Sequence, residues 1–192
     1  MTENPIGEGG KWINGKAVGL DWRNVQTVPG KAYASETVEA NNRYSDPIAV
    51  LNTTFAADQF AQGTVSRVPG YSNPTDGHEI ELLLRFQITA NNARGYEVLW
   101  GQGGNMAIVR WNGPLGSYTP LVDNLQIGAA VDGDVLRVEM VGNVIQVYKN
   151  GALVATATDS TYATGQPGIG FWPTPGSTLQ SYGWKSFEAG SL

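Results

Sequence analysis

The sequence predicts an all-β fold, a sandwich of two antiparallel sheets with little or no helix. Many short runs alternate apolar and polar side chains, which is the pattern of a strand with one buried face. Glycine-rich turns separate these runs at short spacing, without the strand–helix alternation that a parallel sheet requires. No stretch keeps a helical apolar period over several turns, so little helix is expected.

The composition is that of one globular domain. The chain has 192 residues, of which 25 are Gly and only 15% are charged, against about 25% charged residues in average globular proteins. We expect residues 1–10 to form a polar lead-in and residues 11–192 to form a single domain. The net charge of -5 disfavours nucleic acid and anionic membrane surfaces as partners. The absence of cysteine excludes disulfides and thiolate metal sites.

The clearest strands lie in the segment 133–172. Leu136, Val138 and Met140 fall on one face of a first strand, and Ile145 and Val147 fall on one face of the next. The turns between these strands contain Gly and Asn, which tolerate the positive φ that a tight hairpin needs. This segment therefore predicts an antiparallel meander with one dry face and one wet face.

The remaining elements follow from the same alternation and from the Gly and Pro residues that interrupt it. Extended segments are expected, in chain order, at 11–15, 20–28, 31–35, 47–52, 60–68, 78–89, 96–100, 106–111 and 179–189. Loops are expected at 38–46, 70–77 and 113–124. In the strand at 78–89 the apolar face is expected to hold Ile80, Leu82, Leu84, Phe86 and Ile88. The opposite face is expected to hold Glu79, Glu81, Leu83, Arg85 and Gln87.

Residues 133–159, GDVLRVEMVGNVIQVYKNGALVATATD, resemble the strand meander of concanavalin A-like and laminin-G-like jelly rolls. The later strand at 165–171 is similar to the GxxGxGF strand of the same superfamily. The resemblance covers about residues 11–189 and implies a jelly-roll β-sandwich. It leaves the function open, because this fold serves lectins, glycan-binding modules, glycanases, lyases and phage structural proteins.

Acidic residues on two neighbouring strands are the candidates for catalysis. Glu79 and Glu81 share one face of the strand at 78–89, and Glu97 lies on the next strand. Family 16 glycanases of the resembled superfamily use a strand of the form E-x-D-x-x-E. Here only the first two positions match, loosely, and leucines follow them. If the protein is an enzyme, Glu79, Glu81 and Glu97 would act in a polysaccharide hydrolase or lyase; otherwise they form ordinary cross-strand ion pairs.

Aromatic and charged side chains are the candidates for glycan binding. The chain has 6 Trp and 8 Tyr, and such rings stack on the apolar faces of sugars while presenting a polar edge. Tyr118 and Trp172 are further ring candidates. The expected glycan-binding residues are Glu81, Arg85, Glu97, Trp100, Arg110, Trp111 and Tyr148.

Oxygen ligands for calcium are few. Asp132 and Asp134 precede a strand in an Asp-Gly-Asp sequence, which is a weak calcium pattern and also a turn pattern in its own right. Other carboxylates that could ligate calcium are Asp21, Asp46, Asp58 and Asp123. No other cofactor is expected.

These features predict a non-catalytic, lectin-like module that binds a glycan or a neighbouring protein subunit, with no nucleic-acid partner and no membrane insertion. We expect it to be a surface component of a larger assembly, such as a phage virion. No signal peptide is recognisable in the chain, and an extracellular or virion surface location is expected rather than a cytoplasmic one. The alternatives are a polysaccharide hydrolase or lyase acting in a concave groove, and a purely structural decoration protein.

Overall fold

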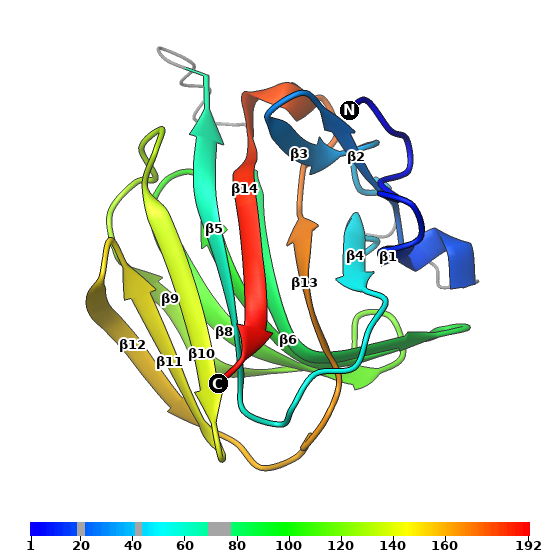
Figure 1. Ribbon diagram of the computed structural model, residues 1–192. Helices are drawn as coiled ribbons and strands as arrows, with labels where there is room; N and C mark the ends of the chain where they lie inside the picture. Colours follow the sequence, from blue (N-terminus) through cyan, green and yellow to red (C-terminus); the bar gives the residue numbers. More distant parts are fainter. Residues whose placement is uncertain (19–21, 41–43, 69–77) are drawn as a thin grey trace.

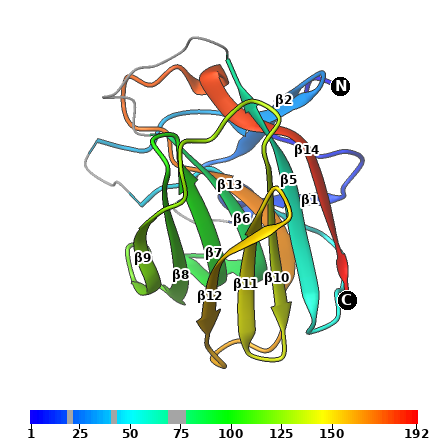
Figure 2. The same cartoon turned by 90° about the vertical axis from the view of Figure 1, so that its left-hand side faces the viewer.

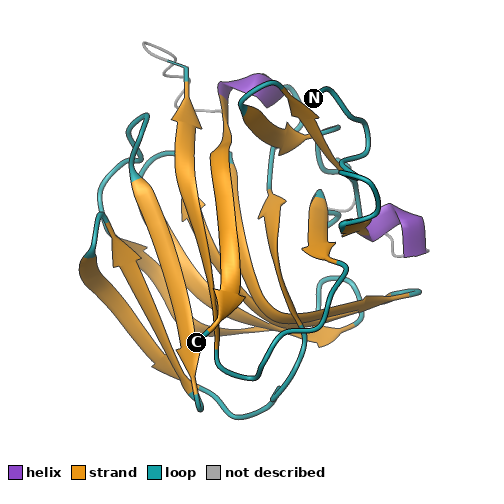
Figure 3. Cartoon of the chain, in the orientation of Figure 1, coloured by secondary structure: helices purple, strands orange, loops and turns teal. Residues whose placement is uncertain are grey.

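The computed structural model describes residues 1–18, 22–40, 44–68 and 78–192, and these form two packed sheets of seven strands each (Figure 1). The predicted all-β sandwich is therefore confirmed. Helix within these residues is limited to two short 3-10 segments, η1 (Gly15–Val18) and η2 (Leu179–Ser181) (Figure 3). Neither is an apolar helix long enough to cross a membrane. The loop expected at 70–77 and the candidate ligand Asp21 lie outside the described residues.

The two sheets form separate layers (Figure 2), and neighbouring strands of the described chain are antiparallel in both. Sheet 1 contains, in spatial order, β1 (Trp12–Asn14), β4 (Ile48–Leu51), β13 (Gln166–Phe171), β6 (Glu79–Thr89), β7 (Asn92–Gly101), β8 (Asn105–Gly113) and β9 (Tyr118–Gln126). Sheet 2 contains β12 (Ala152–Thr158), β11 (Val144–Lys149), β10 (Val135–Val141), β5 (Gln59–Arg67), β14 (Tyr182–Ser191), β3 (Lys31–Ala34) and β2 (Val25–Val28).

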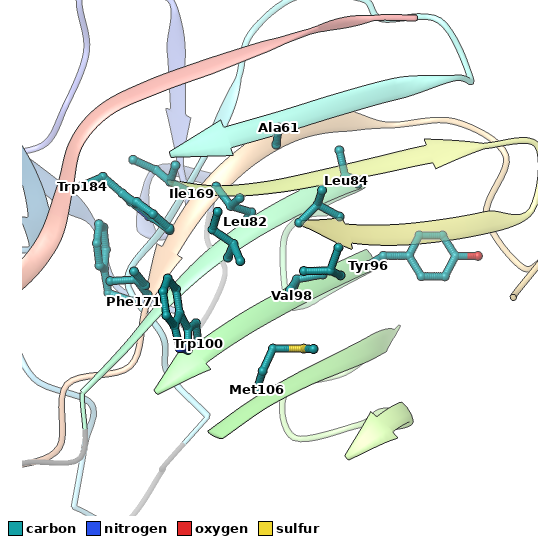
Figure 4. Packing of buried hydrophobic residues seen from close by; sticks show 14 of the residues in the cluster. Ala61, Leu82, Leu84, Tyr96, Val98, Trp100, Met106, Ile169, Phe171 and Trp184 are labelled. Carbon is teal, nitrogen blue, oxygen red and sulfur yellow. The ribbon is translucent and has the colours of Figure 1, made fainter. Parts of the chain in front are cut away.

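The main core lies between the sheets, where the apolar face of each strand meets that of the other layer (Figure 4). The meander β10–β11–β12 forms as predicted, and Leu136, Val138 and Met140 are fully buried in this core. From sheet 1, Leu82 and Leu84 enter the same core. Two-residue alternation thus places one row of each strand in the sandwich interior.

The predicted faces of β6 are wrong beyond Leu84, because a β-bulge interrupts the alternation. Arg85 adopts a left-handed φ of 46°. Leu84 pairs with Tyr96 and Gln87 with Arg94, so that two residues of β6 oppose one residue of β7. Phe86 consequently packs on the outer face of sheet 1, against Trp22, rather than in the main core.

Two segments expected to be irregular contribute to the sandwich. Residues 118–126, mostly expected as loop, form the edge strand β9, which pairs only with β8 among the described strands. An edge strand accommodates Pro120, since one side of it makes no ladder hydrogen bonds. Near the N-terminus, Ile6 is buried and donates its backbone N–H to Val25 O at 2.8 Å, so residues before Lys11 also contribute to the core.

Candidate functional site

The outer face of sheet 1 is partly covered by a second apolar cluster. Trp22 lies over the sheet with its indole 4.6 Å from that of Trp111 and 6.1 Å from the ring of Phe86, measured between centroids. This outer cluster contains Trp22, Ile48, Val50, Leu83, Phe86, Ala93, Ala107, Val109 and Trp111. Because apolar side chains cover this part of the outer face, the polar groups that could meet a ligand lie beside the outer cluster.

A cavity of about 310 Å³ opens on this face beside the outer cluster. Its acidic lining residues are Asp46, Glu79, Glu81, Glu97 and Asp123. Its aromatic lining residues are Tyr44, Trp111, Tyr118 and Trp172. Leu99, Ala107, Val109 and Pro120 complete the lining. The volume is at the lower end of the range of about 300–1,000 Å³ that is typical of small-molecule sites.

Three of these acids, Asp46, Glu81 and Glu97, form what we call the acid cluster. One carboxylate oxygen of each lies within 4.8 Å of the others. The residues are only 4%, 1% and 3% exposed, respectively. Buried carboxylates in such proximity are rare unless they hold a proton or a cation, so the cluster marks this part of the cavity as chemically distinct.

The pairing of the strands explains how the acid cluster assembles. Glu81 on β6 lies opposite Leu99 on β7, and Glu97 on β7 lies opposite Leu83, so the two glutamates are diagonal neighbours on one face. Asp46 comes from the loop before β4. Strand β13 lies between β4 and β6, and its Gly170 pairs with Ile48 on one side and with Glu81 on the other.

Gly170 allows the Glu81 carboxylate to lie directly over β13. A Cβ atom at position 170 would be 2.0 Å from Glu81 Oε2 and 3.1 Å from Ile48 Cγ2. Such a contact is far too short for any side chain, so this close approach requires glycine.

Burial and mutual repulsion shift the acid cluster toward its protonated form. Burial, and then the Glu97 carboxylate, raises the pKa of Asp46 well above its usual value. The same two causes, in the same order, raise the pKa of Glu81. Burial raises the pKa of Glu97 to about 8, even though the hydrogen bond from Trp111 lowers it.

An aromatic row runs from the outer cluster to the mouth of the cavity. It comprises Trp22, Trp111, Tyr118 and Tyr44, whose successive ring centroids are 4.6, 5.5 and 5.8 Å apart. Trp111 also donates its indole N–H to Glu97 Oε2 at 2.7 Å. Tyr118 is 40% exposed and Tyr44 is 42% exposed, so these two rings remain accessible to a ligand.

Eight of the residues proposed from the sequence line this cavity: the candidate acids Glu79, Glu81 and Glu97, the candidate rings Trp111, Tyr118 and Trp172, and the calcium candidates Asp46 and Asp123. Arg85 does not. Its guanidinium donates to the carbonyl oxygens of Ala57, Tyr162 and Gly142 at 2.8 to 3.0 Å, and it is held there by the bulge. Arg85 therefore ties chain segments together at one end of the sandwich.

Three other proposed glycan-binding residues also lie away from the cavity. Trp100 has the same parity on β7 as Val98 and is fully buried between the sheets. Arg110 forms an ion pair with Asp159 at 2.5 Å. Tyr148 lies on β11 in sheet 2.

The aspartates of the Asp-Gly-Asp sequence have other partners. Asp132 accepts hydrogen bonds from Lys185 Nζ and Arg67 N–H. Asp134 accepts from Asn150 and from Val131 N–H. These donors occupy the oxygens that a calcium ion would need, and they give both side chains a role in turn and strand pairing.

Sequence reasoning named Asp46 only as one of several loose calcium candidates and did not name Tyr44. Asp46 directly precedes Pro47 at the start of β4, which is a position at a strand end. Its proximity to Glu81 depends on β13 pairing between β4 and β6. No local sequence signal reports such a long-range arrangement.

No family model matches the sequence, and no curated protein is similar to it in sequence. Solved structures are similar in fold. The carbohydrate-binding module CBM66 from Bacillus subtilis has a TM-score of 0.60 at 13% identity, with 94% of this chain and 92% of that chain covered. The carbohydrate recognition domain of Emp46p, in a potassium-bound form, has a TM-score of 0.57 at 9% identity, with coverages of 95% and 89%. A β-glucanase from Bacillus licheniformis has a TM-score of 0.51 at 16% identity, with coverages of 98% and 92%.

These similarities define the class of the protein by its fold. The chain has the concanavalin A-like jelly-roll fold, an architecture shared by lectins, carbohydrate-binding modules and glucanases. The jelly-roll fold that the resemblance of residues 133–159 implied is thereby confirmed. At these identities the likeness concerns the fold, and the function has to be argued from the cavity.

Proposed function

We propose that the protein binds carbohydrate in the cavity on the outer face of sheet 1, without cleaving it. The observation that carries the proposal is the aromatic row, which ends at the exposed rings of Tyr118 and Tyr44 beside the acid cluster. A sugar presents apolar C–H faces to rings and hydroxyl groups to carboxylates, so this combination suits it. The similar structures that are named as carbohydrate-binding or carbohydrate-recognition domains support the same class of ligand.

The test is to screen the protein on a glycan array and to titrate the best ligand by calorimetry. Replacing the ring in Tyr118→Ala is expected to weaken binding about tenfold, which corresponds to about 1.4 kcal/mol. Tyr148→Ala is the matched control, because Tyr148 is a partly exposed tyrosine on sheet 2. An array that stays blank, or an equal loss in both variants, would contradict the proposal.

Hydrolysis is the second candidate, and one specific observation favours it. Glu81 and Glu97 approach each other on neighbouring strands, and Glu97, with a pKa of about 8, holds a proton at neutral pH as a general acid must. A retaining mechanism, however, needs the partner carboxyl to be ionised. Because burial also raises the pKa of Glu81 well above its usual value, binding without cleavage is favoured.

A reducing-sugar assay across β-glucans and uronans distinguishes the two candidates. A non-catalytic protein releases no product, and neither Glu81→Gln nor Glu97→Gln changes that result. Product release by the wild type that falls by about a hundredfold or more in Glu97→Gln would establish general acid catalysis instead.

Assembly with other subunits stays a prediction. None of the similar structures described above is named as a virion protein, and the proposed binding of carbohydrate does not require a particle.

A further inference from the structure

The acid cluster lies in a cavity whose described lining contains acidic but no basic side chains. Of the cavity-lining residues that the structure describes, five are acidic and none is Lys, Arg or His. Each of the cluster residues is more than nine-tenths buried, so water screens their mutual repulsion poorly. Since no described lining residue is basic, the described part of the cavity leaves a proton or a bound cation as the neutralising group.

Two of the cluster oxygens have no hydrogen-bond partner among the residues that the structure describes. These atoms are Asp46 Oδ1 and Glu81 Oε2, and both are fully buried. Buried carboxylate oxygens are almost always paired, because removing them from water without a partner costs about 1–3 kcal/mol or more. Unpaired carboxylate oxygens within one cluster are typical of metal ligands, because the ion takes the place of hydrogen-bond donors.

We propose that the acid cluster binds one calcium ion, held by Asp46, Glu81 and Glu97 at the floor of the cavity. Since one oxygen of each residue lies within 4.8 Å of the others, a point between them lies no more than about 2.8 Å from all three, close to calcium–oxygen distances of about 2.3–2.6 Å. A purely carboxylate donor set selects a hard cation over zinc or copper. Calcium fits three protein carboxylates better than magnesium, which demands near-ideal octahedral geometry and usually keeps several waters with only one or two carboxylates.

The neighbouring residues support this role. Trp111 donates to Glu97 Oε2 and so orients that carboxylate, as partners of metal ligands commonly do. Gly170 allows Glu81 to approach β13. Calcium takes about 6–8 oxygen ligands, so three carboxylates leave positions that water or a hydroxylated ligand fills from the cavity.

The experiment uses terbium and calcium as probes. Tb³⁺ occupies oxygen-rich calcium sites and emits strongly when it is excited through a nearby indole, here that of Trp111. The wild-type protein is expected to show this emission, to lose it on addition of excess CaCl₂, and to unfold at a higher temperature in CaCl₂ than in EDTA. Glu81→Gln and Asp46→Asn are each expected to weaken Tb³⁺ binding about tenfold or more. MgCl₂ is expected to compete less well than CaCl₂.

Asp132→Asn is the matched control, because it removes an acid whose oxygens are already occupied by Lys185 and Arg67, and its emission is expected to stay at the wild-type level. Circular dichroism in EDTA checks that each variant is folded. Wild-type protein without emission and without a calcium-dependent shift would show that the carboxyls hold protons only, and would overturn the proposal. Emission that persists in both Glu81→Gln and Asp46→Asn, or stronger competition by magnesium, would overturn it as well.

Calcium binding and carbohydrate binding fail separately in these experiments. A wild-type protein that binds calcium while the glycan array stays blank, with and without calcium, retains the cation site and loses the proposed function. If the protein shows no terbium emission and its carbohydrate binding is unaffected by EDTA, the proposed function stands and the calcium site is contradicted.

Discussion

Asp159 and Glu97 are both poorly exposed carboxyls, yet their pKa values shift in opposite directions. Burial raises the pKa of Asp159, but hydrogen bonds from Tyr96, Thr161 and Arg110 outweigh burial and hold it below its usual value. Tyr96 Oη donates at 2.7 Å and the Arg110 guanidinium at 2.5 Å. Among the described residues Glu97 has one side-chain donor, Trp111, which does not offset burial and the nearby carboxylates, so the pKa of Glu97 rises. The number of donors around a carboxylate therefore decides the sign of the shift.

Asp159→Asn is expected to destabilise the protein by about 1–3 kcal/mol at pH 7. Because the folded-state pKa lies below the unfolded value of about 3.9, the stabilisation by Asp159 is present above about pH 4 and is lost as the pH falls through the folded-state pKa. The difference in the free energy of unfolding between wild type and variant is thus expected to narrow toward about pH 2. Urea unfolding at a series of pH values measures it.

The matched control is Glu139→Gln, which removes the partner of Arg137 from a more exposed ion pair on sheet 2. Such a pair contributes about 0–1 kcal/mol, so little change is expected at any pH. If the free energies of unfolding of wild type and Asp159→Asn differ by the same amount at every pH, the role assigned to the carboxylate charge is contradicted.

At the scale of the elements, β13 is the strand on which the floor of the cavity depends. Gly170→Ala is expected to destabilise the protein by about 1–3 kcal/mol in EDTA, because the added methyl group meets Glu81 Oε2 and Ile48 in a packed interior. The variant is also expected to displace the Glu81 carboxylate and to weaken terbium binding. Urea unfolding and terbium emission measure the two effects.

Gly103→Ala is the control for β13. Gly103 is exposed, and a Cβ there would meet no atom within 4 Å. The free energy of unfolding of the Gly103→Ala variant is therefore expected to stay within about 0.5 kcal/mol of the wild-type value. Equal losses of stability in Gly170→Ala and Gly103→Ala would show that the close approach of Glu81 to Gly170 is not the cause of the destabilisation.

Strand content was predictable from alternation, whereas departures from alternation were not. The meander and the inner face of β6 up to Leu84 follow from a period of two. The bulge at Arg85 has no local signal, because Leu82, Leu83 and Leu84 are apolar on both faces. Trp100 was misassigned although its parity with Val98 already placed it inside. Pro120 concealed β9 because proline is rare in strands away from an edge.

The candidate site was predictable only in part, for a related reason. Glu81 and Glu97 lie on consecutive strands, so hairpin pairing brings them together. Asp46 joins them through β13, which is far away in the sequence. Contacts of that kind depend on sheet order, and a single sequence contains no direct record of sheet order.

At the scale of the whole molecule, β6 is buried on both sides, between the main core and the outer cluster. Its residues Leu82 and Leu84 enter the former, and Leu83 and Phe86 enter the latter. By contrast, β12 is an edge strand on which Leu153 is 53% exposed. Backbone amides of β6 are therefore expected to exchange about tenfold or more slowly than those of β12. Hydrogen exchange followed by mass spectrometry checks this order, and similar rates in both strands would contradict it.

The place of β14 in sheet 2 limits when the molecule can fold during its synthesis. This final strand lies between β5 and β3, and its Trp184 packs against Gly63, where a Cβ would be 2.4 Å from the indole. Without residues 182–191, sheet 2 lacks a middle strand, and β5 and β3 each have an unpaired edge. Sheet 2 is therefore completed only once β14 is available, and until then the edges of β5 and β3 are open to pairing with other chains.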